Sequence, residues 1–364
     1  MVARVGFLIA SLLIAPTAVR SQDTLTVADT LPGRAINLGV GRVGLSLGNS
    51  SRWNGIRINW SDRAVREVNG VNVTFWRPRE NRFATYRGVS VGLAPVGREL
   101  NGLSVGIAGV VAERATRGIT VAGLGTVSNG DMMGVNLAGV GVVSQGSMYG
   151  LNLSGLGTVS EGDMVGINLA GLGTVSQGDM VGLNLSGLGT VSQGAMRGVN
   201  VAGLGTVAQG DMEGISIAGL GTVAQGHMYG INVSGLGTVA EGSMRGLNVA
   251  GLGVVGIRGV TGIAVTLGGI ESREMVRGIA VAGYRVKSPL VQGLAVPVAW
   301  LRVGRLEGAS ISVYNRVLVE QRGLAIGVVN FARELHGIQL GLVNIAGNNH
   351  GWRRVLPVVN LHLN

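Results

Sequence analysis

The sequence contains no cysteine, which excludes disulfide bonds, thiolate zinc sites, cysteine nucleophiles and lipid attachment through an N-terminal cysteine. Charged residues are also scarce, since they make up 13% of the 364 residues against a typical ~25%, and aromatic residues make up 4%. Lys287 is the single lysine. Hydrophobic residues nevertheless reach 46% and glycines number 65, so the composition fits neither a disordered chain nor an ordinary packed enzyme.

Long apolar runs are missing beyond the N-terminus, because no later segment offers ~18 apolar residues without a glycine. A helical membrane anchor is therefore not expected. The N-terminus carries Arg4 followed by an apolar run over residues 5–14, which is the pattern of a secretory signal peptide. We predict a signal peptide over residues 1–21, a mature chain beginning at Gln22, and an exported protein at the cell surface or in the outer membrane.

Catalytic signatures are missing as well. The sequence has no His-Glu-x-x-His motif, no Gly-x-Ser-x-Gly elbow between a strand and a helix, and no phosphate-loop lysine. Four aspartates recur at one turn position of a repeat, but without the nonapeptide spacing of calcium-binding repeats: Asp131, Asp163, Asp179 and Asp211. The sequence therefore predicts a protein that is not an enzyme and that has no cofactor and no metal site.

The net charge of +10 is distributed unevenly along the chain. Residues 119–255 hold seven acids and two arginines, whereas the flanks hold most of the basic residues, including Arg77, Arg79, Arg353 and Arg354. No aromatic-interleaved RNA motif accompanies these arginines, so nucleic acid is not an expected partner. The expected partners are envelope or surface components, such as an anionic glycolipid or a carbohydrate, and membrane association fits the same charge distribution.

A glycine that opens an apolar pair recurs every 16 residues, without a slip, from Gly118 to Gly278. The same glycine continues upstream and downstream at steps of 14 to 18 residues. After the signal peptide, the repeats divide the chain into N-terminal divergent repeats and a cap (22–117), regular 16-residue repeats (118–277), and C-terminal divergent repeats and a cap (278–364). No second domain remains.

One repeat, residues 166–181, reads GINLAGLGTVSQGDMV. Ile167 and Leu169 alternate with small or polar residues, which is the period-2 pattern of a half-buried strand, and Gln-Gly pairs supply turns. No stripe with the 3.6-residue period of a helix occurs, so the sequence predicts an all-β protein. In a coil, we expect Ile167, Leu169 and Leu172 or Val175 to stack on their equivalents as the core.

Two columns of identical residues favour a repetitive parallel β-solenoid with coils of 14–16 residues. In such a stack, equivalent residues lie ~4.7–4.8 Å apart, so that amides form ladders and thioethers form a continuous seam. The methionine column contains Met132, Met148, Met164, Met180, Met196, Met212, Met228 and Met244. The asparagine column, which Ser216 interrupts, contains Asn136, Asn152, Asn168, Asn184, Asn200, Asn232 and Asn248.

An antiparallel meander closed into an outer-membrane β-barrel is the alternative. Apolar residues outside and small polar residues inside would explain the low charge of the repeats. Barrels of this kind carry aromatic girdles, however, and the regular block contains only Tyr149 and Tyr229. An even repeat also requires a bulge or an odd loop in every unit, because a two-residue hairpin loop would swing the apolar set to opposite faces on successive strands.

The stretch 323–346, GLAIGVVNFARELHGIQLGLVNIA, resembles the bacterial surface-repeat proteins, whose units read approximately Gly-apolar-Gln-apolar-Gly-Leu-Val-Asn-apolar-Ala. The residues that carry the resemblance are Gly337, Gln339, Gly341, Asn344 and Ala346. The resemblance implies an envelope or cell-surface repeat protein without catalytic residues. The regular block departs from this pattern, because Gly-Leu-Gly-Thr-Val replaces Gly-Leu-Val-Asn-Ile there.

Aromatic residues gather near the two ends of the chain, where a stack of coils must cover its open edges. They fit aromatic and charged caps, or a surface that binds carbohydrate or lies at a membrane interface. The candidate surface-binding aromatics are Trp53, Trp60, Trp76 and Trp352. A column of threonines from Thr126 to Thr238 would likewise form a flat rank that is reminiscent of ice-binding coils, although β-propensity favours threonine there too.

The sequence therefore predicts an exported, non-enzymatic repeat protein of the bacterial envelope or cell surface with a structural or adhesive role. About 20 coils at ~4.7–4.8 Å each would form a rod roughly 90–95 Å long. The alternative function is that of an outer-membrane β-barrel acting as a passive pore.

Overall fold

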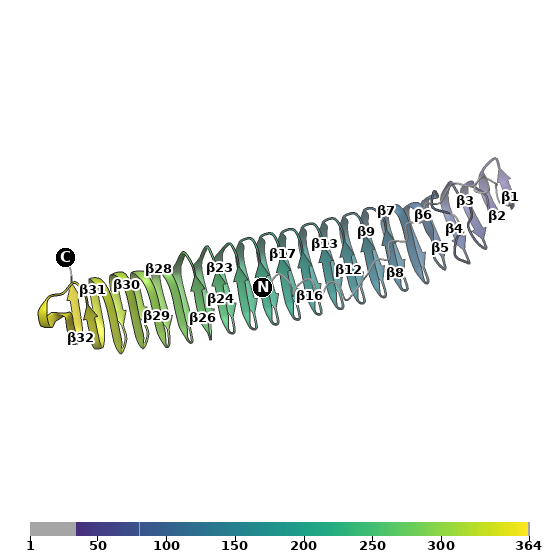
Figure 1. Ribbon diagram of the computed structural model, residues 1–364. Coiled ribbons are helices and arrows are strands. Elements are labelled where there is room, and N and C mark those ends of the chain that lie inside the picture. Colours follow the sequence, from purple (N-terminus) through teal and green to yellow (C-terminus); the bar gives the residue numbers. More distant parts are fainter. Residues whose placement is uncertain (1–33, 80, 363–364) are drawn as a thin grey trace.

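The computed structural model describes residues 34–79 and 81–362, which form a single rod of stacked coils (Figure 1). The prediction of an all-β protein built as a β-solenoid is confirmed, with about 18 turns and coils of roughly 16 residues. The one helical segment in the described part of the chain is a short 3-10 helix, Gly351–Arg354. The predicted signal peptide, residues 1–21, lies outside the described residues.

Each regular coil consists of one long strand and one short strand joined by two tight turns. The long strands are β9 (Met132–Ala138), β11 (Met148–Ser154), β13 (Met164–Ala170), β15 (Met180–Ser186), β17 (Met196–Ala202), β19 (Met212–Ala218), β21 (Met228–Ser234), β23 (Ser243–Ala250), β25 (Gly259–Thr266) and β27 (Met275–Ala282). The short strands are β8 (Gly125–Ser128), β10 (Gly141–Ser144), β12 (Gly157–Ser160), β14 (Gly173–Ser176), β16 (Gly189–Ser192), β18 (Gly205–Ala208), β20 (Gly221–Ala224), β22 (Gly237–Ala240), β24 (Gly253–Gly256) and β26 (Gly269–Ser272).

The coils at both ends are less regular. The N-terminal strands are β1 (Ala35–Val40), β2 (Val43–Gly48), β3 (Arg52–Asn59), β4 (Glu67–Thr74), β5 (Thr85–Gly92), β6 (Val96–Gly106) and β7 (Gly109–Ala122). The C-terminal strands are β28 (Arg285–Pro297), β29 (Trp300–Ile311), β30 (Tyr314–Ile326), β31 (Val329–Ala346) and β32 (Val355–His362). Several of these strands run on around a corner of the coil, so that one strand takes the place of a long and a short one.

Strands of neighbouring coils pair in parallel and in register from β2 to β31, as in the pairing of Met164 with Met180 and of Asn168 with Asn184. Antiparallel pairs occur at the two ends of the stack, where β1 covers β2 and β32 covers β31. The antiparallel meander, and with it the closed barrel, is therefore wrong. Parallel pairing of equivalent strands requires identical register in every coil, which the constant 16-residue step supplies.

The recurring glycine is fixed by the backbone. Gly182 has a φ of +118°, and a Cβ atom there would lie 2.1 Å from the carbonyl oxygen of Gly166 in the preceding coil. Gly166 has a φ of +124° and the same close approach to Gly150. Only glycine adopts this conformation without strain and leaves room for the adjacent coil. The glycine therefore bends every long strand and sets the 16-residue period.

The interior of the coil reverses the expected assignment of faces. Met164, Asn168 and Thr174 are fully buried, whereas Ile167 is 42% exposed. Leu169 also points outward and is half-buried. Alternation along a strand shows which residues share a face, but it does not show which face is inside. Here the two strands of a coil lie close together, so that small side chains and one methionine per coil fill the space between them.

The stack ends before the last predicted repeat. Gly351 begins the 3-10 helix instead of another coil, and the chain then returns as the antiparallel strand β32. With about 18 turns at ~4.7–4.8 Å each, the rod is roughly 85 Å long, slightly shorter than the sequence predicted.

Candidate functional site

The asparagine column forms a hydrogen-bonded ladder inside the rod. The side-chain amide of each asparagine donates to the carbonyl oxygen of the next, at 2.8 Å for every step from Asn136 to Asn200 and at 3.0 Å from Asn232 to Asn248. Ser216 breaks the ladder, and the amide nitrogens of Asn200 and Asn248 consequently have no partner in the described structure. The ladder allows a polar group to be buried in every coil because each amide satisfies its neighbour.

Hydroxyl groups pair within some coils and not in others. Ser154 hydrogen-bonds to Thr158 at 2.9 Å, and the same pair recurs at 2.8 Å as Ser186 with Thr190 and as Ser234 with Thr238. In other coils an alanine replaces this serine, and the threonine hydroxyl then lacks a partner among the described residues, as at Thr174. The threonine column is fully buried, so it offers no flat rank for ice.

The large apolar side chains of the regular coils form four outward-facing rows, which we call the apolar face. The first two rows lie on the long strands and contain Ile119, Val135, Leu151, Ile167, Leu183, Val199, Ile215, Ile231 and Leu247, and Val121, Leu137, Leu153, Leu169, Leu185, Val201, Ile217, Val233 and Val249. The third row, which we call the corner row, lies in the turn and contains Leu124, Val140, Leu156, Leu172, Leu188, Leu204, Leu220, Leu236 and Leu252. The fourth row lies on the short strands and contains Val127, Val143, Val159, Val175, Val191, Val207, Val223, Val239 and Val255.

The corner row is the most exposed of the four. Leu156, Leu204 and Leu220 each leave 48% of their surface accessible, and Leu252 leaves 66%. Monomeric soluble proteins rarely expose a contiguous apolar patch larger than a few hundred Å². Because the rows continue over nine coils without a charged residue, the apolar face marks an interaction surface rather than scattered surface leucines.

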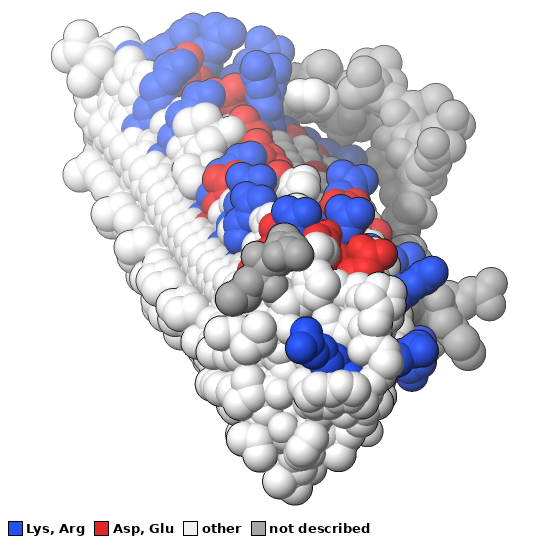
Figure 2. All heavy atoms as spheres, turned by 90° about the vertical axis from the view of Figure 1, so that its left-hand side faces the viewer, with Lys and Arg blue, Asp and Glu red and all other residues white. Residues whose placement is uncertain are grey.

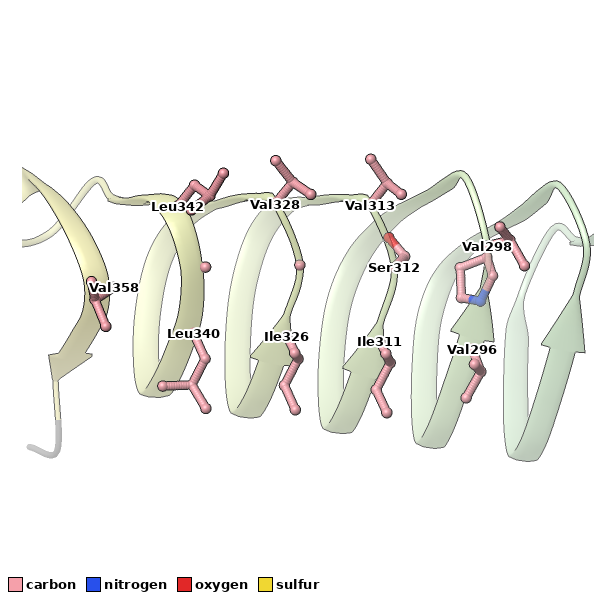
Figure 3. A pocket seen from close by; sticks show the side chains of 13 residues that line it. Val296, Val298, Ile311, Ser312, Val313, Ile326, Val328, Leu340, Leu342 and Val358 are labelled. Atoms are coloured by element: carbon pink, nitrogen blue, oxygen red, sulfur yellow. The ribbon is translucent and has the colours of Figure 1, made fainter.

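In the C-terminal coils the apolar face becomes a groove (Figure 3). One wall consists of Val296, Ile311, Ile326 and Leu340, and the other consists of Val298, Val313, Val328 and Leu342. The floor is made of small or compact residues, Pro297, Ser312, Gly327 and Gly341, which leave a volume of ≈ 750 Å³ between the walls. The groove runs across four coils along the rod axis and is almost entirely apolar.

Charged residues gather along the opposite edge of the rod. Figure 2, which views the rod from its C-terminal end, shows them in a band along one side while the neighbouring side is free of them. We call the part of this band in the regular coils the charged edge, and it contains Gln145, Glu161, Asp163, Gln177, Asp179, Gln193, Arg197, Gln209, Asp211, Glu213, Gln225, Glu241 and Arg245. Arg197 lies 3.0 Å from Asp179 and 3.6 Å from Glu213, so ion pairs link successive coils along it.

The recurring turn aspartates have a structural partner. The carboxylate of Asp179 accepts a hydrogen bond from the backbone N–H of Ala195 at 2.8 Å, and Asp211 accepts one from His227 at 2.7 Å. Each aspartate thus satisfies the turn of the next coil. Within residues 34–79 and 81–362, no three His, Asp or Glu side chains gather as a metal site requires.

An aromatic cluster of Trp60, Phe75 and Trp76 lies on the surface of the N-terminal coils. Trp60 and Trp76 stack with ring centroids 6.4 Å apart and an interplanar angle of 5°, and Trp60 is 68% exposed. Trp76 donates its backbone N–H to Trp60, and the same ladder continues into the turns that carry the corner row. Arg77 and Arg79 follow directly and are exposed.

Trp53 and Trp352 differ from this cluster. Trp53 is only 2% exposed and donates its indole N–H to the backbone oxygen of Gly44 at 2.9 Å, so its assignment as a surface-binding aromatic was wrong. Its place at the second residue of β3 points it into the coil interior, where the narrow end of the stack has room for a large ring. Trp352 is 76% exposed and lies under Arg353 at the C-terminal end.

The N-terminal coils bury a charged cluster behind Trp53. Arg57 is fully buried, and its guanidinium lies 2.5 Å from the carboxylate of Asp62. Tyr86 donates its hydroxyl to the same carboxylate at 2.7 Å. Burial alone would raise the pKa of Asp62, but the Arg57 charge and the hydrogen bonds from Tyr86 and Thr74 hold this pKa below its ordinary value. Burial and the Asp62 charge raise the pKa of Tyr86 well above its ordinary value.

Comparisons of the chain with protein-family models, curated proteins and solved structures gave no match. Among the described residues, no helix is long and apolar enough to cross a membrane. The charged cluster was not predicted from the sequence, because Arg57, Asp62 and Tyr86 belong to three different coils and fall in no repeat column. The signal for the apolar face was present, since the low charge of the repeats already left the outward positions without enough polar residues to cover the rod.

Proposed function

We propose that this chain is an exported, non-enzymatic repeat protein of the bacterial envelope or cell surface, with a structural or adhesive role. The observation that carries the proposal is the division of one continuous rod into an apolar face and a charged edge, which run parallel to its axis. A rod with such a lengthwise division is suited to lie against an extended surface. The similarity of residues 323–346 to bacterial surface repeats supports the same role.

The structural part of the role follows from how the coils contact one another. Each coil pairs with the coil before it and the coil after it through parallel ladders, and both ends are covered by antiparallel strands. Stability in such a stack is approximately a sum of contacts between neighbours, so the rod holds its shape along its whole length. The structure therefore supports a rigid spacer or scaffold.

The adhesive part rests on the aromatic cluster. Exposed tryptophan rings contact the apolar faces of sugars and also sit at membrane interfaces. Trp60 and Phe75 leave 68% and 57% of their surface accessible beside Arg77 and Arg79. These residues offer ring faces and positive charge to an anionic glycolipid or carbohydrate. A passive pore, by contrast, would require a closed antiparallel sheet, which the parallel ladders do not form.

Cell fractionation tests the proposal. The full chain, expressed in a bacterial host with an epitope inserted after Asn349, is followed through cytoplasm, periplasm, washed membranes and medium, and intact cells are treated with protease. We expect the epitope in the envelope or medium, and a shortened product when residues 1–21 are replaced by a cleavable reference signal peptide only if the native segment is itself removed. Retention of the intact chain in the cytoplasm would contradict the proposal.

A further inference from the structure

The apolar face of this rod needs a partner, and its shape indicates which kind. Its four rows lie on the long strands, around the corner and on the short strands, so the face is convex and covers more than one side of each coil. A second rigid copy would cover one side and leave the corner row or the opposite strands in water. Fluid acyl chains follow a convex surface and cover all four rows together.

We propose that the rod lies in the interface of an anionic lipid membrane, with the apolar face in the acyl region and the charged edge in water. This inference names the surface to which the proposed envelope protein binds, and in that sense it rests on the proposed function. The lengthwise separation of apolar and charged side chains is the arrangement of interfacial amphipathic elements, in this case spread over a β-rod rather than a helix.

The backbone of the apolar face is ready for a medium without water. Parallel ladders pair the N–H and C=O groups of β13 and β15 with the adjacent coils. The corner turn is paired as well, since Leu172 donates its N–H to Leu156 at 2.7 Å and Leu188 donates to Leu172 at 2.7 Å. Lipid contact at this face therefore strands no backbone hydrogen-bonding group, which is the main restriction on protein structure in an acyl environment.

The N-terminal coils add charge and aromatic rings at the boundary of the same face. Phe75 and Trp76 occupy the turn that continues into the corner row, through Ile107 and then Leu124. Arg77 and Arg79 come directly after them, are exposed and have no carboxylate partner in the described structure. Aromatic rings favour the headgroup level of a bilayer, and arginines bind lipid phosphates. Their position beside the apolar face matches an anionic membrane surface.

The C-terminal groove fits the same partner. Its walls of valine, isoleucine and leucine are spaced around a floor of small residues over four coils, which is an elongated apolar channel open to one side. Such a channel accommodates an extended acyl chain along the rod axis. A flat rigid partner would leave its floor empty.

Vesicle flotation of the purified full chain tests the proposal. The vesicles contain phosphatidylglycerol and phosphatidylethanolamine, and phosphatidylcholine vesicles serve for comparison. We expect the chain to float with the anionic vesicles, to bind phosphatidylcholine more weakly, and to lose part of the difference as salt is raised. Acyl chains brominated near the headgroup should quench tryptophan fluorescence, and the variant Trp60→Phe/Trp76→Phe should lose most of that quenching.

Matched variants of the same coils separate lipid contact from a general effect of charge. Leu188→Glu/Leu204→Glu places two carboxylates on the corner row, and Gln193→Glu/Gln209→Glu places two on the charged edge. We expect the corner-row variant to bind anionic vesicles about tenfold or more weakly, because it removes two leucines from the acyl region. The edge variant should stay within about twofold of the parent. Circular dichroism confirms that both variants keep the β-fold.

Three results would overturn the proposal. Failure of the parent chain to float with anionic vesicles is one, and equal loss of binding in the two variants is another. The third is a stable dimer or oligomer without lipid, by analytical ultracentrifugation, that the corner-row variant converts to monomer, since a second copy would then cover the face. The parent function is tested separately: envelope location in cells without vesicle binding defeats this inference alone, whereas cytoplasmic location defeats the proposed function.

Discussion

The regular coils and the N-terminal coils solve the same packing problem with different chemistry. In the regular coils the interior polar groups are neutral, and each Asn side chain pairs with an identical one in the next coil at 2.8 Å. In the N-terminal coils the interior holds the Arg57–Asp62 ion pair, joined by Tyr86 and Asn72. A neutral ladder can be extended without limit, whereas a charged cluster must be completed within a few coils.

This difference explains why one region repeats and the other does not. Asparagine carries both a donor and an acceptor, so a column of asparagines satisfies itself. Arginine only donates and carboxylate only accepts, so a column of either would bury unpaired like charges. The N-terminal coils therefore need different residues in each coil, and they form a distinct end to an otherwise uniform stack. The following predictions challenge this comparison, beginning with the largest expected effect.

Asp62→Asn should destabilise the N-terminal coils most. The substitution keeps the shape of the side chain but leaves the buried Arg57 charge without a counter-charge, which typically costs about 3–5 kcal/mol. Asp179→Asn in the regular coils should change stability by less than about 0.5 kcal/mol, because its amide oxygen still accepts from Ala195 at an exposed turn. Urea unfolding followed by Trp53 fluorescence and circular dichroism compares the two. Equal effects would show that the N-terminal cluster is not held by charge.

The same cluster predicts a pH dependence for the N-terminal end. The pKa of Asp62 is lowered in the folded state, so its stabilising contribution is present above the ordinary carboxyl pKa of about 3.9 and is lost as the pH falls below it. The pKa of Tyr86 is raised, so its contribution is present below about pH 10 and is lost at higher pH. Tyr86→Phe should remove the alkaline loss. Simultaneous acid unfolding of the regular coils would argue against a local cause.

Gly182→Ala should destabilise the regular stack by about 3 kcal/mol or more, because the methyl group meets the Gly166 carbonyl oxygen at a φ that alanine rarely adopts. Gly189→Ala in the same coil is the control. Its Cβ would lie 3.6 Å from the nearest atom, an ordinary contact, and its φ is not in the left-handed region. Thermal unfolding by circular dichroism should separate the two variants clearly. A tolerant Gly182 would mean that the period of the coil is set elsewhere.

Ser216→Asn should stabilise the regular coils by about 1–2 kcal/mol. The new amide would accept from the unpartnered amide nitrogen of Asn200 and donate to Asn232, which joins the two ladders into one. Asn184→Ser creates a second interruption, and its effect should have the opposite sign and a similar size. Denaturant midpoints of the parent and both variants measure this. A destabilised Ser216→Asn variant would show that the ladder does not set the stability of these coils.

The smallest expected effect belongs to Ala170→Ser. It should pair with the unpartnered hydroxyl of Thr174, as Ser154 pairs with Thr158 at 2.9 Å, and stabilise the rod by about 0.5–1 kcal/mol. Ala170→Val, which adds bulk without a hydroxyl, should be destabilising instead. Precise calorimetric midpoints are needed to measure a change of this size.

The sequence by itself determined the period, the strand content and the shared columns of this protein. A glycine every 16 residues, alternation of period 2 and the asparagine column all follow from local backbone rules and from the register of a parallel stack. The close approach of Gly182 to Gly166 shows why the period could be recognised, since one position in each coil accepts no other residue.

Only the tertiary structure decided which face lies inside. Alternation assigns Asn168 and Ile167 to opposite faces, and burial of the apolar set is the usual outcome, but the narrow coil takes the small polar set and its ladder instead. The cluster of Arg57, Asp62 and Tyr86 was likewise decided by stacking, because residues from three coils meet only after the coils have formed. Periodicity is a local property of the chain, whereas the choice of interior depends on the space between strands that are distant in sequence.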